Sequence, residues 1–327
     1  MTPGINDIPE TALNWHRAGK GAVLATVIET WGSAPRPTGS QLAISGAGEI
    51  AGSVSGGCVE GAVVIEAMEA LQGGTMRILE YGVSDDEAFA VGLACGGKIR
   101  VMVEPIGAVL TENMLADICT ARSERNALAY VVNTTTWDRR LIRADDPSLC
   151  SRISARFRSD KSGFKDAEFV AIHNPPLRMV VVGAVHIAQS LMKIARLAGY
   201  DAVLVDPREA FGAKARFPDE TILSDWPDQA LSDFGLDART AVVTLTHDPK
   251  LDDPAITTAL NSGVFYLGCL GSTRTHAKRV ARLQDAGFKD VQISQIHAPV
   301  GLDIGAKSPA EIAISVMAEI TQRLRQG

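Results

Sequence analysis

The sequence lacks the features that would place it in a membrane, in a secretory pathway or on nucleic acid. No apolar run reaches the roughly 18 residues of a membrane-spanning helix. The N-terminal segment MTPGINDIPE has neither the basic nor the apolar region of a secretory signal. There is no basic excess, since 32 Lys and Arg stand against 38 Asp and Glu, and nucleic acids and acidic membranes select basic faces. We therefore expect a cytoplasmic protein without nucleic-acid partners or stable membrane insertion.

Cysteine is also scarce. The five cysteines are an odd number and lie far apart in the sequence, which argues against a disulfide framework and favours a reducing compartment. None belongs to a C-x-x-C pair, so a structural zinc site is not expected.

The length and composition fit an ordinary globular protein. At roughly 150 residues per domain, 327 residues predict about two domains. Hydrophobic residues make up 46% of the chain and charged residues 21%, which is enough apolar material for two cores. The hydrophobic pattern weakens between residues 159 and 176, so we expect an N-terminal domain over residues 1–165 and a C-terminal domain over residues 177–327.

The second half alternates strand and helix patterns. Strands are expected at 178–183, 201–206, 240–248 and 263–272, and the clearest helices at 186–198 and 309–324. This alternation is typical of a parallel sheet with helices on both faces. We predict an α/β chain whose C-terminal domain is a Rossmann-like, doubly wound parallel-sheet domain.

The first half mixes the same two elements less regularly. Apolar runs predict strands at 21–30, 98–105 and 128–133, and helical periodicity predicts helices at 59–71 and 114–125. The N-terminal domain is therefore predicted to be α/β as well.

The turn that starts at Gly183 carries a variant of the dinucleotide-binding motif. Its frame is G-x-G-x-x-A, followed by His186 in the helix, but Val185 occupies the second glycine position, where backbone normally approaches a pyrophosphate. Asp206 follows at about the spacing of an acid that binds ribose hydroxyls. Two interpretations remain open: a site that still binds NAD(P) or another nucleotide, and a Rossmann fold whose dinucleotide site is altered or lost. Because a branched side chain should crowd the phosphate, we predict weak or absent dinucleotide binding.

A glycine-rich turn delivers Cys58 to the start of a predicted helix. Gly56 and Gly57 precede the cysteine, and a helix N-terminus favours anions and stabilises a thiolate. The alternative is a small buried cysteine behind a glycine turn. Cys95 and Gly96 form a similar pair, and two glycine-flanked cysteines would suit a soft metal or sulfur centre if they converge.

Other polar residues follow the predicted strands of the second half. His247 and Asp248 end one strand, Ser272 ends another, and His297 opens a glycine-punctuated loop. Ligands of open α/β sheets bind at the carboxyl ends of strands, so these residues are candidates for one cleft. The alternative for each histidine is a structural role. Cys119, Cys150 and Cys269 lack glycine neighbours and are predicted to be core residues.

Taken together, these segments resemble the XdhC/CoxI family of accessory proteins for bacterial molybdenum hydroxylases. The matching pieces include GSAPRPTGSQLAIS, GSVSGGCVEGAV, CGGKIRVMVEP, VVVGAVHIAQSL, LGCLGSTRTHAKRVARL and IHAPVGLDIGAKSPAEIAISVMAEI, in family order and over most of the chain. The resemblance implies a chaperone that binds molybdenum cofactor, helps it acquire or keep its sulfido ligand, and passes it to the apo-hydroxylase. It further implies a cysteine desulfurase and a second copy of the chain as candidate partners.

The candidate site follows from this resemblance and from the motifs above. The expected cofactor-binding residues are Cys58, Cys95, Gly56, Gly57, Gly96, Gly183, His186, Asp206, His247 and Ser272, with Cys58 and Cys95 as candidate ligands of the cofactor's molybdenum. Domain interfaces are favoured places for ligands, so the cleft is expected between the two domains. Two other functions remain open: an NAD(P)-dependent oxidoreductase and a nucleotide-responsive regulatory protein. The chaperone interpretation requires no catalytic residues.

Overall fold

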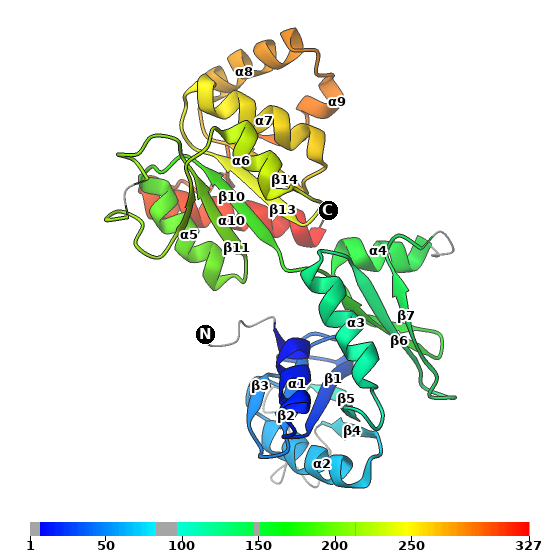
Figure 1. Ribbon diagram of the computed structural model, residues 1–327. Helices are drawn as coiled ribbons and strands as arrows, with labels where there is room; N and C mark the ends of the chain where they lie inside the picture. The colour runs from blue at the N-terminus through cyan, green and yellow to red at the C-terminus, as the bar shows by residue number, and fades with distance from the viewer. Residues whose placement is uncertain (1–6, 83–96, 147–150, 213, 327) are drawn as a thin grey trace. The chain divides into compact units, whose positions relative to one another are not determined.

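The computed structural model describes residues 7–82, 97–146, 151–212 and 214–326. The chain divides into two compact units, Met1–Pro175 and Pro176–Gly327 (Figure 1). The predicted site residues Cys95 and Gly96, and also Cys150, lie outside the described residues.

The first unit contains an antiparallel sheet in the order β3-β2-β1-β5-β4 among the described strands. These strands are β1 (Ala22–Trp31), β2 (Gln41–Ser45), β3 (Ile50–Gly52), β4 (Arg77–Tyr81) and β5 (Lys98–Pro105). The central strand β1 is covered on both faces, which explains why its first seven residues are all buried and, except for Thr26, apolar. One face packs against α2 (Glu60–Gly73), and the other packs against α1 (Ile8–Arg17) and α3 (Glu112–Ser123).

A second antiparallel sheet of the first unit has the order β7-β6-β9-β8 in the described part of the chain. It consists of β6 (Leu128–Asn133), β7 (Arg139–Arg143), β8 (Gly163–Lys165) and β9 (Glu168–His173), and α4 (Ser151–Ser159) packs on it. The last two strands lie in the stretch where the hydrophobic pattern is weak. Because β9 pairs with β6 along its whole length, residues 166–175 belong with the first unit.

The second unit is a parallel sheet in the order β12-β11-β10-β13-β14-β15. Its strands are β10 (Arg178–Val182), β11 (Asp201–Val205), β12 (Thr221–Leu223), β13 (Thr240–Thr244), β14 (Tyr266–Cys269) and β15 (Ile296–His297). In chain order within this unit the arrangement is 3-2-1-4-5-6, the order of the Rossmann fold, with the switch point between β10 and β13. The predicted fold class is thereby confirmed.

Helices cover both faces of this parallel sheet. They are α5 (His186–Leu197), α6 (Pro227–Phe234), α7 (Pro249–Ser262), α8 (Thr273–Asp285), α9 (Asp290–Ile293) and α10 (Pro309–Gln326). Helices α5 and α10 share one core with the sheet, whereas α6, α7 and α8 share the other. Every residue of β10 is buried, as expected for a strand that is covered on both faces.

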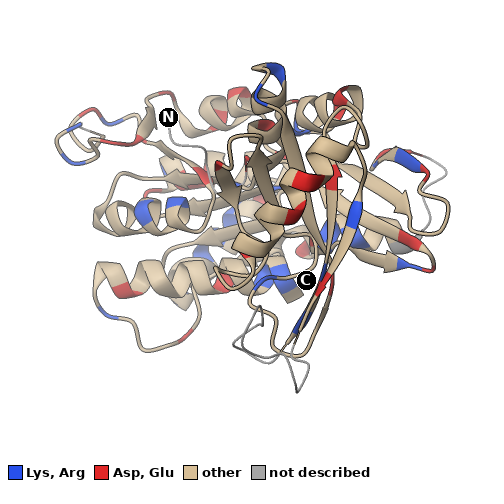
Figure 2. Ribbon diagram, turned by 90° about the horizontal axis from the view of Figure 1, so that it is seen from below, with Lys and Arg blue, Asp and Glu red and all other residues tan. Residues whose placement is uncertain are grey.

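The charges of the described residues are mixed in sign over both units. Figure 2 shows Lys and Arg interspersed with Asp and Glu along the ribbon, in keeping with the small net charge of −6. Within the described ranges, no helix combines the length and the apolar character that crossing a membrane requires.

Candidate functional site

Three glycine-containing segments of the first unit meet at one end of its five-stranded sheet. Strand β1 ends at Trp31, which pairs with Lys98 at the start of β5. A Cβ at Gly97 would lie 2.8 Å from the carbonyl oxygen of Ser33, and a Cβ at Gly56 would lie 3.7 Å from the side chain of Pro35. The 32–38 loop therefore contacts both the turn that carries Cys58 and the segment that leads into β5.

Cys58 lies at the exposed tip of this arrangement. Gly56 and Gly57 have φ angles of 73° and 110°, which glycine adopts without the steric cost of a side chain. The next residue, Val59, is the N-cap of α2, and the Cys58 thiol is exposed to solvent. The alternative interpretation of Cys58 as a small core residue is therefore wrong.

The carboxylate of Glu60 organises the Cys58 turn from within. One oxygen accepts hydrogen bonds from the Ser53 hydroxyl at 2.7 Å and from the amides of Val54 and Ser55 at 3.2 and 2.9 Å. The other accepts hydrogen bonds from the Gly57 amide at 2.9 Å and from the Ser55 hydroxyl. The side chain is nearly buried, with a relative exposure of 9%. Burial alone would raise the pKa of Glu60, but these hydrogen bonds lower it to about 2.

This geometry corrects the expectation that the glycine turn is an open anion site. The amides of Val54, Ser55 and Gly57 already bind the chain's own carboxylate, so they are not available to a phosphate. The group that the turn presents to solvent is the Cys58 thiol. A glutamate two residues after the cysteine is the sequence signal that could have predicted this arrangement.

Arg36 is a candidate ligand-binding residue that the sequence analysis missed. It lies between Pro35 and Pro37 in the loop that contacts Gly56, and its side chain is half-buried. Its Nε atom is buried without a hydrogen-bond partner, and Arg36 forms no ion pair within the described part of the protein. A guanidinium held between two prolines is suited to an anionic ligand.

The remaining described cysteines behave as core residues, as predicted. Burial, followed by the charge of Glu10, raises the pKa of the Cys119 thiol to about 12. Burial raises the pKa of the Cys269 thiol, in β14, to about 11. Among the described residues, no three His, Cys, Asp or Glu side chains come together as a metal site.

In the second unit, the Rossmann turn at Gly183 packs closely against Thr246, and the acid that could bind ribose, Asp206, is already hydrogen-bonded within the protein. Gly183 has a φ of 110°, and a Cβ there would lie 2.6 Å from the Thr246 side chain. His186 is the exposed first residue of α5. Asp206 follows β11, and its carboxylate accepts hydrogen bonds from the Ala184 amide at 2.8 Å and from Arg208 Nε and Nη2 at 2.8 and 2.7 Å. Burial would raise the pKa of Asp206, but these hydrogen bonds hold it below its usual value.

We expect NAD⁺ to bind this unit no more tightly than about 100 µM. Both oxygens of Asp206 are used by Arg208 and the turn, so no acceptor remains for ribose hydroxyls, and Val185 stands where pyrophosphate meets backbone. The double variant Arg208→Ala with Val185→Gly frees Asp206 and removes the branched side chain, so it should bind NAD⁺ about tenfold more tightly or better. Calorimetry measures this difference, and low-micromolar binding by the unmodified protein would contradict the expectation.

His247 follows the carboxyl end of β13, beside the switch point of the sheet, and has a strained backbone conformation. It is exposed, and its φ of 61° lies in the left-handed region, which costs a non-glycine residue about 1–3 kcal/mol. Thr246 Oγ1 donates to the Asp252 carboxylate at 2.6 Å and accepts from the Asp248 amide at 3.1 Å, so the turn around His247 is fixed on both sides. A Cβ at Gly271 would lie 3.7 Å from His247 Nδ1, which places the two loops side by side.

Asp248 and Ser272 cap helices at this end of the sheet. Asp248 accepts a hydrogen bond from the Lys250 amide at 3.0 Å at the start of α7. Ser272 accepts one from the Thr275 amide at 3.2 Å at the start of α8. Gly183, Asp206, His247 and Ser272 thus lie at the carboxyl ends of neighbouring strands, as predicted from the sequence.

Comparison with known proteins gives the same family over both halves of the chain. Residues 15–82 match the model of the XdhC and CoxI family, and residues 179–320 match that of the XdhC Rossmann domain. The chain is 33% identical to the molybdenum cofactor insertion chaperone PaoD of Escherichia coli, over 94% of this chain and 86% of PaoD. It is 28% identical to a probable xanthine dehydrogenase subunit of Bacillus subtilis, over 92% of each chain.

A solved structure supports this relationship. The crystal structure of a protein described as a xanthine dehydrogenase from Bacillus halodurans superposes with a TM-score of 0.76 and 26% identity. The match covers 99% of this chain and 96% of the other. The strand order, the glycine-flanked Cys58 turn and these matches lead to one conclusion: the chain belongs to the XdhC and CoxI family.

Proposed function

We propose that this protein binds molybdenum cofactor and delivers it to the apo-form of a molybdenum hydroxylase related to xanthine dehydrogenase. The similarity to an insertion chaperone over 94% of the chain supports this role. The structural observation that carries it is the exposed Cys58 thiol on a turn that Glu60 holds in place. A carrier needs such a preorganised ligand, because a group that is already fixed loses little entropy on binding.

The residues around Cys58 fit the chemistry of this cargo. The cofactor's metal centre is soft and rich in sulfur, and thiolates are the side chains that such centres prefer. The cofactor also carries phosphate, for which the guanidinium of Arg36, which forms no ion pair with the residues that the structure describes, is a suitable partner. We propose that Cys58 contacts the metal or its sulfur and that Arg36 binds the phosphate. Cys95 and the carboxyl-end residues of the second unit remain predicted contacts.

The wider role of the site includes sulfur handling. We propose that the protein keeps the cofactor bound while its terminal sulfido ligand is installed or protected. A cysteine desulfurase as sulfur source and a homodimer as the working form remain predictions of the family resemblance.

The test combines binding with transfer. Purified protein is mixed with isolated molybdenum cofactor and separated by gel filtration, and molybdenum should elute with the protein. Addition of an apo-hydroxylase should then yield active enzyme. Arg36→Gln should weaken binding about tenfold, whereas Arg17→Gln, whose guanidinium pairs with Glu112, serves as the matched control. Tight NADH binding without cofactor binding would favour the oxidoreductase alternative instead.

A further inference from the structure

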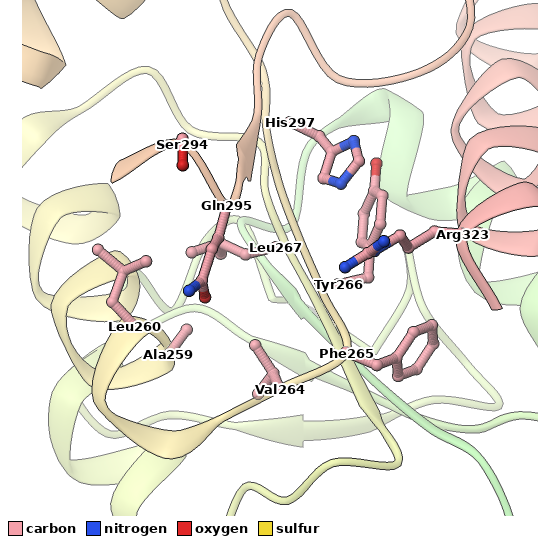
Figure 3. Close-up of a pocket in the computed structure, with 10 residues that line it drawn as sticks. All are labelled: Ala259, Leu260, Val264, Phe265, Tyr266, Leu267, Ser294, Gln295, His297 and Arg323. Atoms are coloured by element: carbon pink, nitrogen blue, oxygen red, sulfur yellow. The ribbon is translucent and has the colours of Figure 1, made fainter. Parts of the chain in front are cut away.

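A pocket of about 290 Å³ lies beside the amino end of β14 in the second unit (Figure 3). Strand β15 pairs with Leu267 and Gly268 and, in the described part of the chain, does not reach Tyr266, the first residue of β14, so the edge of β14 is open there. The pocket is lined by Ala259, Leu260, Val264, Phe265, Tyr266, Leu267, Ser294, Gln295, His297 and Arg323. None of these residues belongs to the Cys58 turn or to the crevice at the carboxyl ends of β10 and β13.

The pocket contains a histidine that a carboxylate orients. Glu319, on α10, accepts hydrogen bonds from His297 Nδ1 at 3.1 Å, from the Gly301 amide at 2.8 Å and from the Tyr266 hydroxyl. Because an ionised carboxylate can only accept, the proton of the neutral imidazole must lie on Nδ1, and Nε2 is then a hydrogen-bond acceptor. The Tyr266 ring stacks on the imidazole at a centroid distance of 4.7 Å and fixes its plane.

Hydrogen bonds keep the carboxyl group of Glu319 ionised although it is partly buried. Burial alone would raise the pKa of Glu319, but the hydrogen bonds from His297, Tyr266 and Gly301 lower it below the usual value. Glu319 is thus a positioning residue for His297 at neutral pH and is not itself part of the pocket lining.

The rest of the lining combines one cation with an aliphatic wall. Arg323 lies one turn after Glu319 on α10, is exposed, and forms no ion pair among the residues that the structure describes. Ala259, Leu260 and Val264 form the opposite, aliphatic side, as Figure 3 shows. None of the described residues that line the pocket is acidic. The ionised Glu319 lies behind His297 and Tyr266 and does not line the pocket, so the lining itself offers Arg323 to an anionic group and an aliphatic wall to an apolar body.

We propose that this pocket is a second ligand site, which binds a small aliphatic hydroxy acid. The carboxylate pairs with Arg323, the hydroxyl donates to His297 Nε2, and the branched aliphatic part packs against Leu260 and Val264. None of the residues that line this pocket is among the residues predicted to bind the cofactor.

The test uses three related probes with the full chain. The first is 2-hydroxy-4-methylpentanoate, which carries all three features. The second, 4-methylpentanoate, lacks the hydroxyl, and the third, 2-hydroxy-4-methylpentanamide, lacks the charge. Calorimetry or NMR titration should show saturable binding of the first probe, with the other two weaker by about tenfold or more.

Variants assign these differences to the named residues. Arg323→Gln should remove the preference for the acid over the amide, and His297→Phe, which keeps a ring on Tyr266, should remove the preference for the hydroxyl. Arg325→Gln on the same helix is the control and should bind as the parent does. Absence of saturable binding by the first probe up to about 10 mM would overturn the proposal. So would Arg323→Gln, an exposed change that should not affect folding, if it binds the three probes as the parent does.

Discussion

Replacing Cys58 with serine should leave the protein folded but remove most of its capacity to bind and deliver molybdenum cofactor. The side chain is exposed, so the change should alter the free energy of unfolding by no more than about 0.5 kcal/mol. Serine keeps the size of the side chain but lacks the soft sulfur ligand. We expect cofactor affinity to fall at least about tenfold. Activation of the apo-hydroxylase should fall in parallel.

Cys119→Ser is the matched control for this experiment. Cys119, on α3, is partly buried and packs against the core of the first unit, and burial raises the pKa of its thiol to about 12, so it is not a thiolate at neutral pH. Its replacement should leave cofactor binding intact. Cys95→Ser and the double variant with Cys58→Ser show whether a second thiol contributes. If all these variants bind cofactor and activate the hydroxylase as the parent does, the cysteines have only structural roles.

The sequence predicted the second unit well because its strands are short, apolar and separated by helices. Each residue of β10 and β13 is buried, so the pattern of the parallel sheet is visible in the sequence without knowledge of any partner. The strands β8 and β9 were not predicted. The three residues of β8 are only partly buried and pair only with β9 among the described strands, whereas β9 itself pairs with β6, which lies far earlier in the sequence.

The candidate site was harder to predict because the hydrogen-bond partners of its polar groups depend on the folded structure. Glycine spacing correctly placed Cys58 on a turn at the start of a helix, but it left open whether the side chain is exposed or buried. It did not show that Glu60 would fill the anion site of that turn, nor that Arg208 would occupy Asp206. In each case a ligand-binding motif and an internally satisfied one contain the same residue types, and only the distances distinguish them.

Of the substitutions described above, Glu60→Ala should cause the largest decrease in the free energy of unfolding. The carboxylate accepts hydrogen bonds from three amides and two hydroxyls. Its removal leaves the buried donors of Val54 and Ser55 without partners, each costing about 1–3 kcal/mol. Water can reach part of the loosened turn, so we expect a total loss of about 3 kcal/mol in the free energy of unfolding. The control is Glu69→Ala on the same helix, an exposed partner of Arg77, which should cost about 1 kcal/mol or less.

The effect of Glu60 should depend on pH in a defined direction. The pKa of its carboxyl is about 2 in the folded protein, against 4.5 in the unfolded chain. Its ionisation therefore contributes stability that is fully present well above pH 4.5 and is lost as the pH falls towards 2. The difference between the parent and Glu60→Ala, measured by urea unfolding, should shrink over this range, whereas that for Glu69→Ala should stay small. Glu60→Ala should also release the Cys58 turn from its fixed conformation. The Cys58 thiol should then react with a maleimide at a different rate from that in the parent, and cofactor affinity should fall although Cys58 is intact. A stability difference that does not change between pH 6 and 3 would show that Glu60 is not held as a carboxylate by this turn.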